Sequence, residues 1–128
     1  MRVFKNKWFN KWARDEHIQD EALWKAAEEI VAGRVEADLG KCLFKKRVAR
    51  RGQGKSGGYR LIVAYKRPNS DKLFFISAFE KNDRPNLKPI EQEALGIVAS
   101  KYIEATDQTI GTLKKMNELF EIEERYHE

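Results

Sequence analysis

Cysteine, histidine and proline are scarce in this chain of 128 residues. The single cysteine, Cys42, cannot close an internal disulfide, which excludes a disulfide-stapled secreted fold and leads us to expect a reducing, cytoplasmic environment. The two histidines, His17 and His127, lie far apart in the sequence with no cysteine cluster beside them, so no zinc-binding pattern is present. We therefore expect neither a metal nor another cofactor.

Long apolar runs are also missing. No stretch approaches the roughly 20 apolar residues that a membrane-spanning helix needs. The N-terminal segment 1–17 is basic and aromatic, but charges interrupt it every two or three residues, so it lacks the apolar core of a secretory signal. The length suits one domain with one core and is too short for two.

Acidic residues are absent from residues 39–70, although the whole chain contains 20 of them. This segment carries ten lysines and arginines, whereas the net charge of the whole chain is +5, so the remainder has a net charge of −5. Such segregation is unfavourable unless the positive face meets an anion. A merely solvated basic hairpin is the alternative, but ten like charges exceed what solubility requires, and we expect a polyanionic partner.

The spacing of apolar residues predicts an α+β fold, in which an N-terminal helical hairpin packs on a small antiparallel sheet and further helices follow. Trp8 and Trp12 lie at helical spacing and are interpreted as core residues rather than as base-stacking platforms. Segment 2–5 is either a strand or an extended lead-in, and segment 119–123 is either a strand or a helix end. The first predicted helix begins at residue 6, and three further helices are predicted over 20–33, 89–105 and 106–117. The predicted strands span 43–49, 59–66 and 73–79.

The chemistry of the basic segment depends on which side chains share a strand face. Alternation places Lys45 and Arg47 on one face of their strand, and Arg60 lies on the next strand. Arginine forks and lysine ammonium groups bind phosphates, and such a cluster could also promote attack of a ribose 2′-hydroxyl on its own phosphate. A lysine with a lowered pKa could take the hydroxyl proton. From the residues alone, catalysis and passive RNA binding are about equally supported.

The glycine-rich stretch 50–58 follows this strand, and it lacks both the order of a phosphate-binding loop motif and a helix after it. Binding of a nucleoside triphosphate is therefore not expected. Lys55 lies within the stretch, and Arg50 and Arg51 begin it.

Residues 46–60, 62–65 and 79–84 resemble the RelE/HigB superfamily, the toxins of type II toxin–antitoxin modules, and residues 3–9 resemble a HigB-like branch. The most specific segments are SGGYR at 56–60 and EKNDR at 80–84. The resemblance covers most of residues 2–104. It implies a RelE-like toxin domain over residues 1–104, with residues 105–128 as a C-terminal extension packed on or next to the same domain.

The resemblance implies an mRNA interferase, a metal-independent endoribonuclease that cuts translated message in the ribosomal A site and is silenced by a cognate antitoxin. Its partners would be that antitoxin, mRNA and ribosomal RNA. Arg60 matches the phosphate-binding arginine of the family, and Lys45 and Arg47 match the paired basic positions that are candidates for base and charge stabiliser. The remaining candidates are Lys81 for catalysis and Lys46, Arg50, Arg51 and Lys55 for RNA binding.

The sequence departs from several RelE-type toxins at two positions. Asn82 stands where they have an arginine, and Lys88 is nearest to the position of their late tyrosine. The identity of the general acid and base is therefore open. Two other functions also stay open, namely a ParE-like inhibitor of DNA gyrase and a basic RNA-binding module without catalysis.

Overall fold

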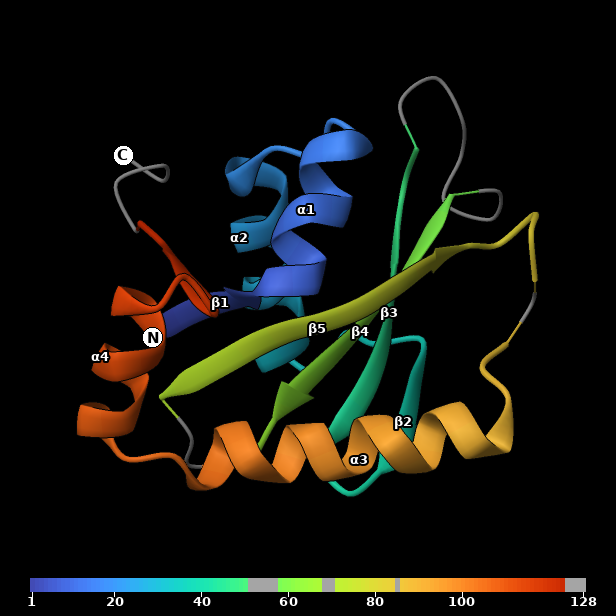
Figure 1. The fold of residues 1–128 in the computed structure, drawn as a ribbon. Coiled ribbons are helices and arrows are strands. Elements are labelled where there is room, and N and C mark those ends of the chain that lie inside the picture. The colour runs from blue at the N-terminus through green and yellow to red at the C-terminus, as the bar shows by residue number, and fades with distance from the viewer. Residues whose placement is uncertain (51–57, 68–70, 85, 124–128) are drawn as a thin grey trace.

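A six-stranded sheet with the strand order β2-β3-β4-β5-β1-β6 forms the centre of the computed structural model (Figure 1). The structure describes residues 1–50, 58–67, 71–84 and 86–123. No helix within these ranges is long and apolar enough to cross a membrane. The elements in chain order are β1 (Arg2–Asn6), α1 (Lys7–Asp15), α2 (Asp20–Val31), β2 (Ala37–Gly40), β3 (Leu43–Val48), β4 (Tyr59–Tyr65), β5 (Lys72–Glu80), α3 (Pro89–Glu104), α4 (Asp107–Lys115) and β6 (Leu119–Ile122).

The α+β class is confirmed, and the three strands predicted from 43–79 form the expected antiparallel meander β3-β4-β5. The sheet is nevertheless mixed, because β1 runs parallel to β5, with Val3 opposite Leu73. β6 then pairs antiparallel with β1, which resolves the open alternative for the end of the chain in favour of a strand.

Helices cover both faces of the sheet, so the molecule has three layers (Figure 1). The pair α1 and α2 packs on one face, and α3 and α4 pack on the other. The sequence of β5 follows from this arrangement. Leu73 and Phe75 lie in the core under α1 and α2, whereas Phe74 and Ile76 lie in the core under α3 and α4. A strand that is buried on both faces reads as a continuous apolar run rather than as an alternating one.

The predicted helical hairpin is present, but one of its tryptophans is not in the core. Asn6 caps α1 by accepting a hydrogen bond from the backbone of Phe9 (2.8 Å). Trp12 packs edge-on against Tyr59, with ring centroids 5.2 Å apart. Trp8 is 50% exposed and stacks on Trp12, so its interpretation as a core residue is wrong.

β2 is an addition to the predicted elements, because residues 33–40 read as a connection. It pairs with β3 through a tight turn in which Lys41 and Cys42 both have positive φ, 51° and 63°. Hairpin turns of this kind usually contain Asn-Gly or Asp-Gly, which supply positive φ at little steric cost. The Lys-Cys pair carries no such signal, and a strand of four residues is too short to show alternation.

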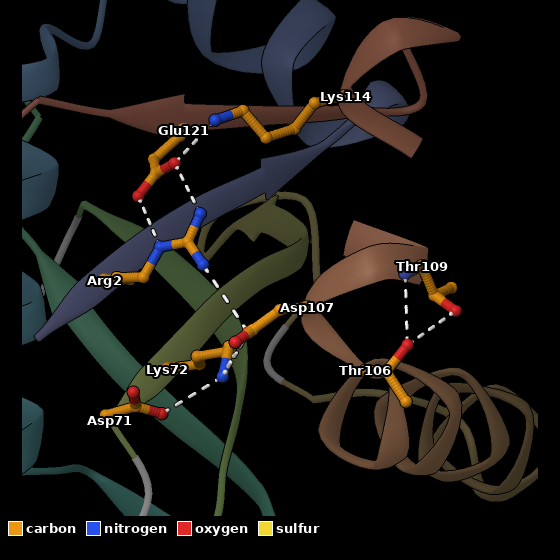
Figure 2. A network of polar contacts seen from close by, with 8 residues as sticks. All are labelled: Arg2, Asp71, Lys72, Thr106, Asp107, Thr109, Lys114 and Glu121. Atoms are coloured by element: carbon orange, nitrogen blue, oxygen red, sulfur yellow. Dashed lines mark hydrogen bonds and ion pairs between the residues drawn. The ribbon is translucent and has the colours of Figure 1, made fainter. Parts of the chain in front are cut away.

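A network of charged side chains fastens the C-terminal elements to the sheet (Figure 2). Arg2 on β1 donates two hydrogen bonds of 2.9 Å to the carboxylate of Glu121 on β6, and Lys114 on α4 donates a third of 2.7 Å. These cations hold the pKa of Glu121 at about 2, well below its usual value. Asp107, at the start of α4, lies 3.2 Å from the ammonium of Lys72 on β5. Residues 107–122 therefore attach to both β1 and β5.

Candidate functional site

The β3–β4 hairpin brings three of the predicted site residues onto one face of the sheet. Arg47 lies directly opposite Arg60 in the register, and Lys45 lies opposite Ile62. Because Ile62 belongs to the core under α3 and α4, the three cations lie on that side of the sheet. Lys45, Arg47 and Arg60 are called the cationic cluster below.

A close approach of backbones fixes this hairpin at the end where Val48 pairs with Tyr59. A Cβ atom added to Gly58 would collide with the carbonyl oxygen of Val48 and would lie 2.8 Å from the backbone nitrogen of Arg50. The carbonyl of Gly58 also accepts a hydrogen bond from the backbone of Lys81 (3.1 Å). Glycine is needed here for lack of space, since any side chain would meet backbone that cannot rotate away. It thereby sets the position of Arg60, two residues along β4.

Arg60 lies at the bottom of the cluster and is only 2% exposed. Its Nε atom is 2.7 Å from Oε2 of Glu36, a residue between α2 and β2. The N–H does not point at that oxygen, so the contact is an ion pair rather than a directed hydrogen bond. The other carboxylate oxygen, Oε1, lies 4.0 Å from Nε of Arg47. The carboxylate of Glu36 therefore lies between the two arginines.

The backbone holds Glu36 in this place, because its N–H donates to the carbonyl of Lys45 (2.8 Å). The sequence interpretation missed Glu36, which it assigned to a connection. No spacing rule relates a residue before β2 to one on β4. The available signal was its position in the sequence, because Glu36 is the second-to-last acidic residue before the basic segment 39–70. Its inclusion leaves the four side chains with a formal net charge of +2.

The segment between β5 and α3 borders the cluster. The Lys45 ammonium donates to Oδ1 of Asn86 (2.9 Å). Arg84 lies over the ring of Phe79, 5.1 Å from its centroid, and forms an ion pair with Glu91 in the first turn of α3. Lys81 extends the β4–β5 ladder by one residue beyond β5, and alternation along the strand places it on the face that holds Phe79 and Arg60.

Two predicted RNA-binding residues lie on the opposite side of the sheet. Lys46 is 7% exposed, and its ammonium lies 3.1 Å from the Glu29 carboxylate and donates to the carbonyl of Arg34 (2.9 Å). An adjacent residue on a strand faces the other way, which separates Lys46 from both of its neighbours in sequence. Its charge is matched within the fold beneath α2, so the structure does not place it at the cluster.

Arg50 is likewise turned toward α1 and α2. Its guanidinium lies 2.6 Å from the Glu80 carboxylate and 5.9 Å from the centre of the Tyr59 ring. The Tyr59 hydroxyl donates to Glu16 (2.7 Å), and burial together with this carboxylate raises the pKa of Tyr59 to about 12. The other two predicted RNA-binding residues, Arg51 and Lys55, lie outside the described residues.

The two positions that depart from RelE-type toxins have different surroundings. Asn82 is exposed in the turn after β5. Lys88 is the N-cap of α3, and its backbone N–H donates to Glu91 (2.8 Å). Over the ranges that the structure describes, no group of three His, Cys, Asp or Glu residues could hold a metal ion.

Comparison with known proteins gives one family. Comparison with curated sequences finds no match. A family model described as the RelE toxin of the RelE/RelB toxin–antitoxin system matches residues 1–122, without distinguishing a HigB-like branch. The match begins before β1 and ends with β6, so it takes in every strand and helix described above. The chain therefore belongs to the RelE family, as a toxin whose counterpart is an antitoxin.

Proposed function

We propose that this toxin is a ribosome-dependent mRNA endonuclease that cleaves by attack of a ribose 2′-hydroxyl on the adjacent phosphate. The observation that carries the proposal is the placement of Arg47 directly opposite Arg60. Like charges opposite one another across two strands are destabilising, and Glu36 offsets only part of this repulsion. An anionic ligand would offset the rest, and the phosphate backbone of RNA is such a ligand.

The three side chains of the cationic cluster differ in exposure to solvent, and we assign them different roles on this basis. Arg47 is about half exposed and Lys45 is partly exposed, so both can meet a phosphate from solvent. They would bind its two non-bridging oxygens and neutralise the charge that grows on them in the transition state. Fixed cations also hold the scissile phosphate in line with the attacking oxygen.

Arg60 has a supporting role in the proposed mechanism. Since it is 2% exposed and its Nε lies 2.7 Å from Glu36, it would act from beneath the phosphate. A direct contact with the scissile phosphate, the role that the family resemblance implies, would require Glu36 to move aside. Lys81 reaches the same face and would stabilise the leaving 5′-oxygen. The products would be a 2′,3′-cyclic phosphate and a 5′-hydroxyl.

The partners follow from the same charges. An acidic segment of the antitoxin would cover the cationic cluster by charge complementarity, and ribosomal RNA would bind other basic residues of the hairpin. These partners would compete for the cluster, because both present anionic groups to Lys45 and Arg47.

The test is cleavage of mRNA on programmed ribosomes, with primer extension to locate the cuts. Arg47→Ala is expected to lower the cleavage rate by a factor of about 100 or more, because it removes a donor to the transition state. The control is Arg14→Ala, which removes a more exposed cation from α1 on the other side of the sheet. Its rate should stay within about twofold of the wild-type rate, as for a surface charge far from a site.

Other outcomes would overturn the proposal. If the wild-type protein leaves the message intact but inhibits supercoiling by gyrase, the ParE-like function replaces it. If the protein binds ribosomes without cutting, the chain is a binding module.

A further inference from the structure

We propose that Glu36 is the general base of this reaction, the group that accepts the proton of the attacking 2′-hydroxyl. The inference rests on the proposed function and assigns the role that the sequence left open. Its basis is the position of a fixed carboxylate among the cations that would hold the scissile phosphate.

The two oxygens of Glu36 have different surroundings. Oε2 is buried and lies 2.7 Å from Nε of the buried Arg60, so that end of the carboxylate is held in place. The side chain is nevertheless 21% exposed, and Oε1 is directed toward Arg47, from which it is separated by 4.0 Å. A distance of 4.0 Å is the loose limit of an ion pair, so Arg47 can turn from Glu36 to a phosphate at little cost. Oε1 is then free to receive a proton.

The other groups of the cluster are poorly suited to this role. A guanidinium stays protonated throughout the physiological range, which excludes Arg47 and Arg60 as proton acceptors. Lys45 must first lose a proton, and its ammonium already donates to Asn86. An ionised carboxylate needs no such step.

Four other carboxylates of the described residues, on or beside these strands, are engaged elsewhere. Glu29 forms an ion pair with Lys46, and Glu80 forms one with Arg50, both on the side of α1 and α2. Glu16 accepts the Tyr59 hydroxyl on that same side. Glu91 accepts from the backbone of Lys88 and pairs with Arg84. Glu36 is the carboxylate that contacts both arginines of the cluster.

The proposed step balances as follows. The 2′-hydroxyl gives its proton to Oε1 of Glu36 while its oxygen electron pair forms the new bond to phosphorus. The bond from phosphorus to the 5′-oxygen breaks, and the 5′-oxygen keeps the electron pair of that bond. It then receives a proton from Lys81 or from water. Glu36 then returns its proton to solvent. Arg60 is a positioning residue here, because it orients the carboxylate without touching the reacting atoms.

The experiment is single-turnover cleavage of mRNA on programmed ribosomes by Glu36→Gln, which keeps the shape of the side chain but cannot accept the proton. The expected result is a rate lowered by a factor of about 100 to 10,000, the usual contribution of a general base, with ribosome affinity within about threefold of wild type. Glu80→Gln is the matched control, since it removes a carboxylate from an arginine on the other side of the sheet. The control should retain the wild-type rate within about threefold.

The dependence of the cleavage rate on pH distinguishes catalysis by Glu36 from a purely structural role. The wild-type rate should fall on acidification, because a general base acts only in its deprotonated form, and Glu36→Gln should lack this decline. Among the described residues, the ionisable groups in contact with the Glu36 carboxylate are Arg47 from β3 and Arg60 from β4, and both are guanidinium cations that keep their charge during acidification. Glu36→Asp should restore the pH dependence at a reduced rate, because the shorter carboxylate is still a base.

The failures are distinguishable. A wild-type protein that does not cleave overturns both the proposed function and this assignment. A wild-type protein that cleaves, together with a Glu36→Gln variant that cleaves within threefold of it or keeps the same pH profile, overturns the assignment of Glu36 alone. If Glu36→Gln does not fold, Glu36→Asp decides, since an unchanged rate in a folded Asp variant would show that the carboxylate position does not matter.

Discussion

Lys46 and Lys45 are adjacent in sequence, yet their side chains serve opposite faces of the sheet. Lys46 is buried against Glu29 and the carbonyl of Arg34, whereas Lys45 lies at the cationic cluster. A buried charge that loses its partner destabilises a fold by several kcal/mol, whereas an exposed charge contributes little. The two lysines therefore provide a matched pair for separating stability from activity.

Lys46→Met is expected to lower the free energy of unfolding by about 2 kcal/mol, because it leaves the partly buried Glu29 without this ion pair. Lys45→Met should change that free energy by less than about 0.5 kcal/mol but reduce cleavage sharply. Urea denaturation and the ribosome cleavage assay measure the two effects. A stable but inactive Lys46→Met variant would contradict the placement of this residue in the fold.

Tyr59 is expected to titrate late. Burial and the Glu16 carboxylate raise its pKa from 10 to about 12, so the neutral phenol is favoured in the folded state. Its contribution to stability is therefore complete below pH 10 and is lost as the pH rises toward 12. The ultraviolet absorbance of phenolate measures this step, and comparison with Tyr59→Phe identifies it. Glu16→Gln should move the step to lower pH, and an unshifted step would contradict the role of Glu16.

At the scale of elements, the β3–β4 hairpin depends on one close approach at Gly58. Gly58→Ala is expected to destabilise the protein by about 2–3 kcal/mol, because the new methyl group meets the backbone of β3 and of Arg50. Cleavage should fall as well, since Arg60 follows two residues later. Thermal unfolding and the cleavage assay measure the two consequences.

Gly111→Ala is the control for that substitution. Gly111 lies inside α4, and an added Cβ would have nothing within 4 Å. Alanine in a helix interior is favoured over glycine by about 0.5–1 kcal/mol, so this variant should be more stable than the wild type. Equal destabilisation by the two substitutions would show that the approach at Gly58 is not the cause.

The attachment of β6 to β1 should depend on pH. The pKa of Glu121 is lowered from 4.5 to about 2 by Arg2 and Lys114, so its contribution is present above pH 4.5 and is lost as the pH falls toward 2. Glu121→Gln is expected to cost about 1–2 kcal/mol at pH 7 after allowance for screening by solvent. Denaturation of both proteins across this range should show the difference shrinking, and a difference independent of pH would contradict the ion pairs as its source.

At the scale of the whole molecule, local patterns in the sequence predict individual helices and strands but only part of how these elements pack and pair. Alternation was sufficient to place Lys45 and Arg47 together, and the register of adjacent strands then brought Arg60 to them. Trp8 was misread because helical spacing shows which residues share a face but does not show that the end of that face is covered. The parallel pairing of β1 with β5 joins segments 70 residues apart, and no local pattern encodes it.

The candidate site divides in the same way. The three cations follow from local rules, whereas Glu36 reaches them through tertiary packing between α2 and β2. Lys46 and Arg50 show the converse, because a basic segment predicts an anionic partner but does not predict which cations already have one within the fold.

A chain that ends at Glu104 is expected to be largely unfolded. The lost residues include Ile110, Leu119 and Ile122, which are at most 2% exposed. At about 1.5–3 kcal/mol for each buried side chain, their loss is comparable to the whole stability of a small domain. Circular dichroism and urea titration of residues 1–104 test this directly. A cooperatively folding fragment would instead support a toxin domain that ends at residue 104.

The place of β1 between β5 and β6 also orders events during synthesis. β1 cannot be flanked on both sides until residue 122 has been made, because its second neighbour is the last strand described. The cationic cluster is translated long before that point. A nascent toxin would thus stay incompletely folded at least until β6 has been made, while it is still attached to the ribosome that it is proposed to attack.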